Sequence, residues 1–370
     1  MKKLLGAVLL VCLALPFIAR ARAQQQPDTV SNDGVPWAYG FATPAAPGGA
    51  APAAGARGGG GGRGGGGGGA APAAPAAPAA PAEPAEDMDA IRHVPGSSQA
   101  LTLRQVESNT GPGDWFPEDH PAMPEVVAHG RRPAVNACAF CHYPNGQGRP
   151  NNAPVAGLPV NYILQQLEDF ASGARSSWDK RKRNTGQMIG FAKALTPEDA
   201  RAAAEYFSSI KARPWIKVVE TDMIPKMTFV GGGGGLVIPV EGAGAGMEPL
   251  GMRIIETPVD VEQTEPLRNP RSGFIAYVPR GSVAKGQALA TRGGGGKTVA
   301  CAACHGEGLR GTDKFPPIAG RSAGYLGRQL SDFKRFTRVG PGSALMQPIV
   351  EKLTDEDILN LTAYVASLQP

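Results

Sequence analysis

The sequence predicts an all-α protein in which two small helical domains are joined by a short β-containing connector. Three observations predict this class. A cysteine pair followed directly by histidine occurs twice, the sequence around it recurs at a fixed spacing, and the segment between the two copies alternates short apolar runs with glycines. A fixed internal period indicates that one structural unit is built twice. We therefore expect helical domains over 95–213 and 273–370 and the connector over 214–272.

The N-terminal segment 1–23 predicts an export signal. Lys2 and Lys3 form a charged start, positions 4–18 are almost all apolar, and the Ala-Arg-Ala sequence at 21–23 is a small-x-small cleavage site. The apolar run is shorter than the ~20 residues that a membrane-spanning helix needs. We therefore expect an exported, periplasmic protein with the signal peptide 1–23 removed. The alternative is an uncleaved N-terminal anchor that holds the chain at the periplasmic face.

Residues 24–94 are expected to form a disordered tether. The part over 44–86 consists almost entirely of alanine, proline and glycine. These residues offer little side-chain surface to bury, and such composition is typical of flexible or extended linkers. We therefore assign no fold to this N-terminal segment.

The charge balance argues against a nucleic-acid partner. The predicted signal peptide holds Lys2, Lys3, Arg20 and Arg22 and no acidic residue, so without it the basic and acidic residues almost cancel. Nucleic-acid binding needs a clustered basic face. The chain has one short basic run, which consists of Lys180, Arg181, Lys182 and Arg183.

The internal repeat extends well beyond the cysteine motif. One constant offset places Cys138–His142 on Cys301–His305 and continues without a gap through Gly157 and Gly320. After a loop that is longer in the first copy, a slightly smaller offset places Met188 on Met346. The two cysteine motifs and the two methionines therefore occupy equivalent positions in the two copies.

The pattern within each copy predicts helices. Apolar residues recur at helical spacing over 162–170 and again over 325–333. Thr196 and Thr354 each precede an acidic residue three positions later, which is an N-cap signature for the final helix of each copy. Two further helices are expected before the cysteine pairs, around Glu125–Gly130 and Ser282–Thr291.

The connector predicts a small β-hairpin element that straps the two domains together. Its short apolar runs are often β-branched and are separated by clusters of glycine, which is typical of strands and turns. The expected strands are Trp215–Val219, Met227–Val230, Leu236–Val240 and Met252–Ile255.

The Cys-x-x-Cys-His motif is the attachment signature of c-type haem. Its thiols add to the two vinyl groups of the porphyrin, and the adjacent histidine reaches the iron. A Cys-x-x-Cys pair alone could instead be a redox disulfide or part of a four-ligand zinc site. A zinc site shared by the two copies would leave both histidines and the repeat unexplained, so we expect two covalently bound haem c groups. The expected attachment residues are Cys138, Cys141, Cys301 and Cys304, with His142 and His305 as iron ligands.

The repeat also indicates the second axial ligand of each iron. Met188 and Met346 coincide under the repeat, and each precedes the final helix on a segment that we expect to be a loop folded over the haem. A single methionine is more often a filler of apolar cores. A bis-histidine alternative exists for the first haem and would use His93, His120 or His129. Histidine–methionine ligation gives a relatively high potential and favours electron transfer.

These residues resemble the class I cytochromes c, and most closely the two-domain dihaem cytochromes of the cytochrome c-four type. The resemblance covers both copies but neither the tether nor the connector, and it rests on the two cysteine motifs, the two methionines, and sequences such as Pro317–Gly320 and Tyr325–Leu330. It implies two all-α haem domains facing each other, haem propionates near the domain interface, and a soluble shuttle role. The chain departs from this family in its tether, its connector and a longer basic loop before Met188.

The function expected from these features is the transfer of single electrons between periplasmic or membrane-bound redox enzymes. An alternative is a cytochrome subunit of a dehydrogenase or respiratory complex. A dihaem peroxidase is less expected, because it would need an open iron position and a distal acid or base. We therefore expect no enzymatic activity. The partners are unknown redox proteins, and the basic run 180–183 is a candidate docking patch for an acidic one.

Overall fold

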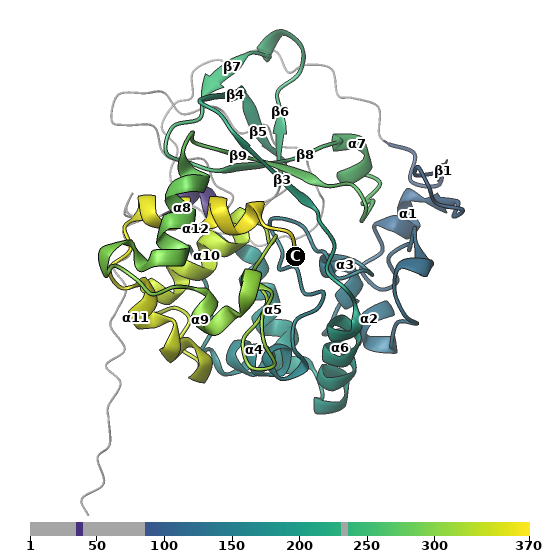
Figure 1. Cartoon of the computed structure of the whole chain (residues 1–370). Coiled ribbons are helices and arrows are strands. Elements are labelled where there is room, and N and C mark those ends of the chain that lie inside the picture. Colours follow the sequence, from purple (N-terminus) through teal and green to yellow (C-terminus); the bar gives the residue numbers. More distant parts are fainter. Residues whose placement is uncertain (1–34, 40–85, 231–235) are drawn as a thin grey trace, which may run out of the picture. The chain divides into compact units, whose positions relative to one another are not determined.

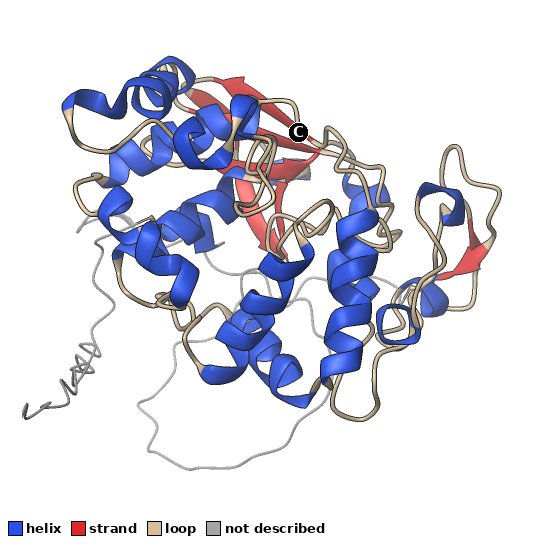
Figure 2. Ribbon diagram, turned by 60° about the horizontal axis from the view of Figure 1, so that its bottom comes forward, coloured by secondary structure: helices blue, strands red, loops and turns tan. Residues whose placement is uncertain are grey.

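The computed structural model describes residues 35–39, 86–230 and 236–370. These residues form two groups of helices, one from each repeat, and a set of short strands contributed mainly by the segment between them (Figure 1). Figure 2 shows the main strands gathered together in a chain that is otherwise mostly helical. The predicted signal peptide and residues 40–85 of the predicted tether lie outside the described residues.

The first helical group is built around its two longest helices. Ile163 of one helix shares an apolar cluster with Ala203 and Phe207 of the other. The helix predicted over 162–170 is confirmed and extends a little at both ends. The helices of this group are α1 (Leu103–Val106), α2 (Glu125–Ala128), α3 (Cys138–His142), α4 (Val160–Ser172), α5 (Arg183–Ala194) and α6 (Pro197–Ser209).

The second helical group depends on a close contact between its first and last helices. A Cβ atom placed on Gly286 would lie 1.9 Å from the carbonyl oxygen of Asn360, so only glycine allows this approach. The helix predicted over 325–333 is confirmed. The helices of this group are α8 (Ser282–Arg292), α9 (Ala302–His305), α10 (Ala323–Lys334), α11 (Gln347–Val350) and α12 (Asp355–Ser367).

The predicted N-caps of the two final helices are confirmed. The Thr196 hydroxyl accepts a hydrogen bond from the amide of Asp199 at 3.2 Å. The Thr354 hydroxyl accepts one from the amide of Asp357 at 3.1 Å, and the Asp357 carboxylate accepts one from the Thr354 amide at 2.9 Å. These contacts satisfy amide groups that the first turn of a helix leaves without an intrahelical partner.

The connector forms a larger β structure than the sequence predicted. The strands predicted over 227–230 and 236–240 are confirmed as β5 and β6, which pair with each other in an antiparallel hairpin. The strand predicted over 252–255 is displaced to 255–258, and the sheet extends beyond residue 272 into the segment assigned to the second domain. The strands of the connector region are β3 (Ile216–Glu220), β4 (Met223–Pro225), β5 (Met227–Val230), β6 (Leu236–Pro239), β7 (Met247–Pro249), β8 (Ile255–Pro258) and β9 (Phe274–Val278).

The reason for this difference is a parallel pairing between distant segments. β9 lies between β3, with which it is parallel, and β8, with which it is antiparallel. Phe274, Ala276 and Val278 of β9 are buried and alternate along the strand. A hairpin pattern cannot reveal a parallel partner, because parallel strands are joined by long connections. The short helix α7 (Val261–Thr264) lies between β8 and β9.

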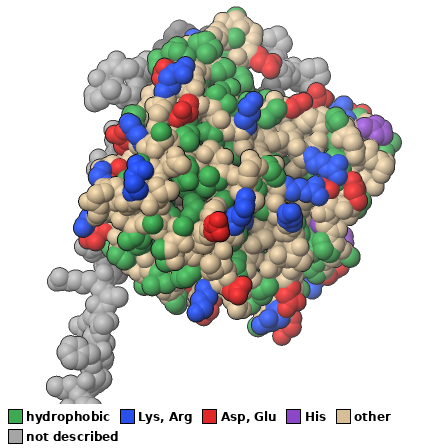
Figure 3. Space-filling model, viewed as in Figure 1, with side chains coloured by type: hydrophobic (Ala, Val, Ile, Leu, Met, Phe, Trp, Pro, Cys, Tyr) green, Lys and Arg blue, Asp and Glu red, His purple; other side chains and the backbone are tan. Residues whose placement is uncertain are grey.

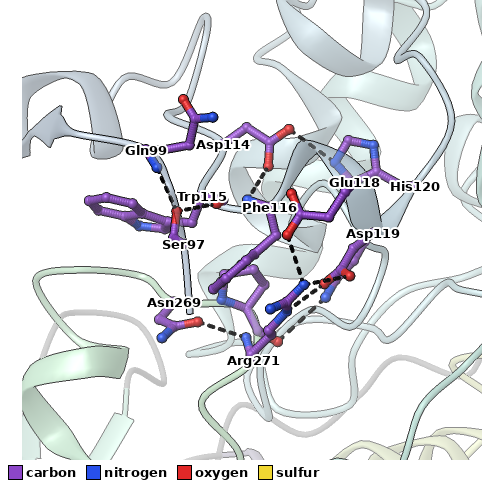
Figure 4. A network of polar contacts seen from close by, with 12 residues as sticks. Ser97, Gln99, Asp114, Trp115, Phe116, Glu118, Asp119, His120, Asn269 and Arg271 are labelled. Atoms are coloured by element: carbon purple, nitrogen blue, oxygen red, sulfur yellow. Dashed lines mark hydrogen bonds and ion pairs between the residues drawn. The ribbon is translucent and has the colours of Figure 1, made fainter. Parts of the chain in front are cut away.

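One arginine of the connector fixes it to the N-terminal part of the first helical group (Figure 4). The Arg271 guanidinium lies 3.6 Å from the centre of the Phe116 ring and forms ion pairs with Asp119 at 2.8 Å and Glu118 at 3.0 Å. The latter two residues belong to the short 3-10 helix η2 (Pro117–Asp119). Nearby, a small hairpin is formed by β1 (Ile91–Arg92) and β2 (Leu101–Thr102).

The prediction that residues 24–94 have no fold is wrong for two short parts. Residues 86–94 are described and include β1. Residues 35–39 include the 3-10 helix η1 (Pro36–Tyr39) and are buried against the second helical group. The Tyr39 hydroxyl donates a hydrogen bond to Asp332 at 2.8 Å. Val35, Trp37 and Tyr39 supply the apolar surface that the neighbouring Ala/Pro/Gly sequence lacks.

The charge pattern of the visible surface agrees with the near-neutral composition. On the face shown in Figure 3, acidic and basic side chains are interspersed.

Among the helices that the structure describes, none has the length and apolar character needed to cross a membrane.

Candidate functional site

The structure gathers the predicted residues of the first copy around one cavity. Cys138, Cys141, His142 and Met188 all line it, although they come from α3 and α5. The cavity wall is mostly apolar and includes Phe207. Its volume is about 180 Å³.

The second copy gathers its predicted residues in the same way. Cys301, Cys304, His305 and Met346 line a second cavity of about 590 Å³. The wall again consists mainly of apolar side chains, including Phe333. The two copies therefore each bring together two thiols, one imidazole and one thioether.

The two histidines are oriented identically by backbone carbonyl groups. Nδ1 of His142 lies 2.8 Å from the carbonyl oxygen of Ala153, and Nδ1 of His305 lies 2.8 Å from that of Pro316. Each Nδ1 therefore donates its proton, which leaves Nε2 as the free acceptor. Burial lowers the pKa of both histidines, which favours the neutral form that can bind a metal. A histidine fixed in this way through its other nitrogen is typical of metal ligands.

In the described part of the chain, none of the four motif cysteines is paired in a disulfide. Burial raises the pKa of Cys138 to about 12 and also raises the pKa of Cys141 and Cys301. Zinc binds thiolates. Within residues 35–39, 86–230 and 236–370, no three His, Cys, Asp or Glu residues are placed to hold a metal ion together. The two cysteine pairs line two different cavities, which does not favour a zinc site shared by the two copies.

The prediction that both methionines lie on loops is wrong for one of them. Met188 lies within α5, whereas Met346 lies between the 3-10 helix η6 (Pro341–Leu345) and α11. Both side chains still line their cavities. In the first copy, the longer loop is therefore followed by α5, and Met188 lines the cavity from within this helix.

The three histidines of the bis-histidine alternative do not line the first cavity. The ring of His120 is turned toward Asp114, with Nε2 3.0 Å from its carboxylate. Nδ1 of His129 lies 3.3 Å from the carbonyl oxygen of Thr110, and His93 is exposed. These positions do not favour histidine as the second ligand.

The basic run 180–183 is not a continuous exposed patch. Lys182 is only 4% exposed and lines the first cavity, and burial lowers its pKa to about 6. Arg181 is exposed but its Nε lies 2.9 Å from the Asp179 carboxylate. The candidate patch is therefore reduced to Lys180, Arg181 and Arg183. The sequence could not show this, because the inward turn occurs at the N-cap of α5.

Sequence reasoning missed a polar wall that the two cavities share. Tyr162, Gln166, Tyr325 and Gln329 line both cavities. The signal was present in the repeat, since the offset that places Cys138 on Cys301 also places Tyr162 on Tyr325 and Gln166 on Gln329.

Two arginines join this wall at equivalent positions. The same offset places Arg175 on Arg338, and both are buried. Arg175 donates hydrogen bonds to Gln166 at 3.0 Å and to Gln329 at 2.8 Å. Arg338 donates to the same two residues, each at 2.8 Å. These contacts make a symmetric polar node between the two copies.

Comparison with known proteins decides the family. The family model described as cytochrome c matches residues 127–211 and 283–369. Cytochrome c-554(548) of Halomonas halodenitrificans is 38% identical over 72 residues, which are 19% of this chain and 87% of that protein. The chain belongs to the cytochrome c family. Both matched regions contain one cysteine motif and one methionine of the cavities described above.

Longer relatives span both copies of this cytochrome. The thiosulfate dehydrogenase electron acceptor of Thiomonas intermedia is 27% identical over 240 residues, which are 64% of this chain and 80% of the relative. Cytochrome c4 of Pseudomonas aeruginosa is 26% identical over 240 residues, 62% of this chain and 83% of the relative. The solved structure of reduced cytochrome c4 from Pseudomonas stutzeri has 23% identity and a TM-score of 0.40, and covers 62% of this chain and 93% of that one.

This cytochrome is thus similar over both copies to the cytochromes c4, and it carries two covalently bound haem c groups. Its cavities fit such groups, since each offers an apolar lining, two thiols and an imidazole with a free Nε2. When bound, each haem supplies an iron that takes up and releases one electron. The protein accordingly transfers electrons between redox partners.

Proposed function

We propose that this cytochrome is a periplasmic electron carrier whose irons are each held by one histidine and one methionine. The ligands would be His142 with Met188 in the first cavity and His305 with Met346 in the second. The observation that carries the proposal is that each cavity receives the same set of four side chains, two cysteines, one histidine and one methionine, from separate elements. The covalent attachment would use the two cysteines of each motif.

The chain's own residues explain why such sites would carry electrons without catalysing other reactions. The backbone carbonyls of Ala153 and Pro316 hold the two histidines in place. Met188 and Met346 would supply the other protein ligand of each iron, and histidine–methionine ligation would favour the ferrous form. With both ligands supplied by the chain, no position would be left for peroxide. We therefore propose that the protein has no peroxidase activity.

The proposed electron donor is a periplasmic dehydrogenase. Two relatives are named thiosulfate dehydrogenase electron acceptors, and they match 64% and 65% of this chain. A role as the cytochrome subunit of such a dehydrogenase complex is compatible with the same relatives. The apolar start of the chain, which lies outside the described residues, would direct export.

The test is a redox titration followed by rapid mixing with a dehydrogenase. Two one-electron transitions at relatively high potential are expected, and a thiosulfate dehydrogenase from a related bacterium should reduce both haems when given thiosulfate. A protein that titrates at low potential, or that binds ligands at either iron, would contradict the ligation. Reduction by other dehydrogenases but not by this one would contradict the proposed donor alone.

A further inference from the structure

An arginine of the connector lies directly on the first haem-attachment motif. Arg268 follows α7 and lies outside both regions matched by the family model. It donates a hydrogen bond from Nη2 to the carbonyl oxygen of Phe140, which lies between the two cysteines of the motif. Its guanidinium is 4.6 Å from the centre of the Phe140 ring and 5.5 Å from that of Tyr143. Three contacts therefore position one cation against the motif.

The charged groups around this motif include two arginines. Arg268 lies directly on the motif, and Arg149 is a second cation near Arg268. The neighbouring carboxylate, Glu265, forms an ion pair with Arg149 at 2.7 Å. Glu107 is a second carboxylate that interacts electrostatically with Arg268, so two carboxylates stand near two guanidinium groups, and the charge of Arg268 is the one in contact with the motif. Because the site is partly shielded from water, salt screens this charge less than it screens surface charges.

The second copy lacks every part of this arrangement. Under the offset that aligns the two cysteine motifs, Phe140, Tyr143 and Arg149 become Ala303, Gly306 and Thr312. The second motif is also open to solvent, since Ala302, Ala303 and Cys304 are exposed. The two aromatic rings that receive Arg268 thus occur only in the copy that the connector covers.

We propose that Arg268 is a positioning residue that raises the reduction potential of the first haem relative to the second. The inference rests on the proposed function, in which Cys138 and Cys141 hold the first haem. A fixed positive charge beside a group that gains an electron stabilises the reduced form, and does so more strongly where the dielectric constant is low. Charge and hydrogen bonding around the ligands are established means of setting such potentials. The connector thereby gives the two haems different reduction potentials.

The experiment is a spectroelectrochemical titration of the full-length protein and four variants. Arg268→Gln removes the charge but keeps a long side chain with donors, so one of the two one-electron transitions should move to lower potential while the other stays. Arg268→Lys keeps the charge and should lie close to the wild type. Glu265→Gln removes a neighbouring acid and should shift the same transition upward. Arg280→Gln changes an exposed residue just after β9 that is paired with Asp222, and it should move neither transition.

The result that overturns the inference is an Arg268→Gln protein with two haems and both potentials unchanged, or with both shifted equally. Haem content, measured for every variant, separates this outcome from failure of the proposed function, which would appear as fewer than two haems in the wild type. To assign the transition that moves, Arg268→Gln is also made in protein that carries Cys301→Ala and Cys304→Ala. This protein holds only the first haem, so its single transition must show the same shift. If Arg268→Gln loses its first haem, Glu265→Gln becomes the test, and an unchanged potential in that variant refutes the inference.

Discussion

Arg175 and Arg338 occupy the same position in the two repeats and donate hydrogen bonds to the same two acceptors, Gln166 and Gln329. Their backbones also form an isolated antiparallel bridge. Each arginine therefore contacts its own copy and the other one. The two haem domains are joined by a buried polar network as well as by the connector.

This network should contribute measurably to stability. Replacing Arg338 with methionine removes one of the two arginine donors of both Gln166 and Gln329 and the donor to the Tyr162 hydroxyl, which should lower the free energy of unfolding by about 3 kcal/mol. Denaturant unfolding followed by Soret absorbance measures this loss. Arg292→Gln, at the exposed end of α8, serves as the control and should change stability by less than about 0.5 kcal/mol. If the two variants were equally stable, the network would not contribute to the free energy of unfolding.

Haem stoichiometry should follow the cysteine motifs. The wild-type protein should retain two haems after acid-acetone extraction, because thioether bonds survive this treatment. Protein carrying Cys301→Ala and Cys304→Ala should retain one. Pyridine haemochrome spectra with protein quantification count the groups, and a wild-type ratio of one haem per chain would contradict the assignment of both cavities.

The proposed methionine ligands have a spectroscopic signature. The oxidised protein should show the weak far-red charge-transfer band of an iron–thioether bond. Met346→His should remove the share of the second haem and lower its potential, because imidazole favours ferric iron more than a thioether does. Met252→His, on an exposed connector residue, is the matched control and should leave the band intact. A band and potentials that survive Met346→His would show that Met346 is not a ligand.

Closed coordination of both irons predicts a poor enzyme. The reduced native protein should bind little carbon monoxide at neutral pH, and peroxide turnover should be negligible. Difference spectra under carbon monoxide and a standard peroxidase assay provide the measurements. Stoichiometric carbon monoxide binding would instead indicate an open or displaceable ligand and favour a peroxidase.

The exposed basic residues before α5 should affect encounter with an acidic partner. Reversing the charges of Lys180, Arg181 and Arg183 should slow electron transfer to the physiological partner at low ionic strength and have little effect at high ionic strength. Lys182 is left unchanged because it is buried, and a charge reversal there would disturb the cavity. Stopped-flow rates over a range of salt concentrations test this. An unchanged salt dependence would point to the second haem, whose motif is exposed, as the docking side.

Much of the site could be predicted because its signals are local and repeated. The Cys-x-x-Cys-His motif fixes three residues by adjacency, and the repeat supplies Met188 and Met346 by correspondence. The N-caps at Thr196 and Thr354 are equally local. Each of these features depends on near neighbours in the sequence or on comparison with the other copy.

What could not be predicted depends on contacts between distant segments. The parallel pairing of β3 with β9 places Ile216 beside Phe274, and the burial of Lys182 depends on how α5 lies against the cavity. Arg268 left a trace in the sequence, since the rings at 140 and 143 have no counterparts in the second copy. This difference between the copies can be interpreted only with the fold, which places Arg268 of the connector against the first motif.

The buried segment Val35–Tyr39 determines where a pull on the N-terminus would be felt. Its hydrogen bonds are with the second helical group, through Asp332 and through Arg328, which donates one to the carbonyl oxygen of Ala38 at 2.6 Å. The Tyr39 ring also packs against Trp178 of the first repeat, with 5.9 Å between the ring centroids. Tension applied to the chain at residue 35 would therefore act on α10 and on the loop before α5 before it reached residue 86. If the N-terminus were held at a membrane, both haem domains would be held through this one short segment.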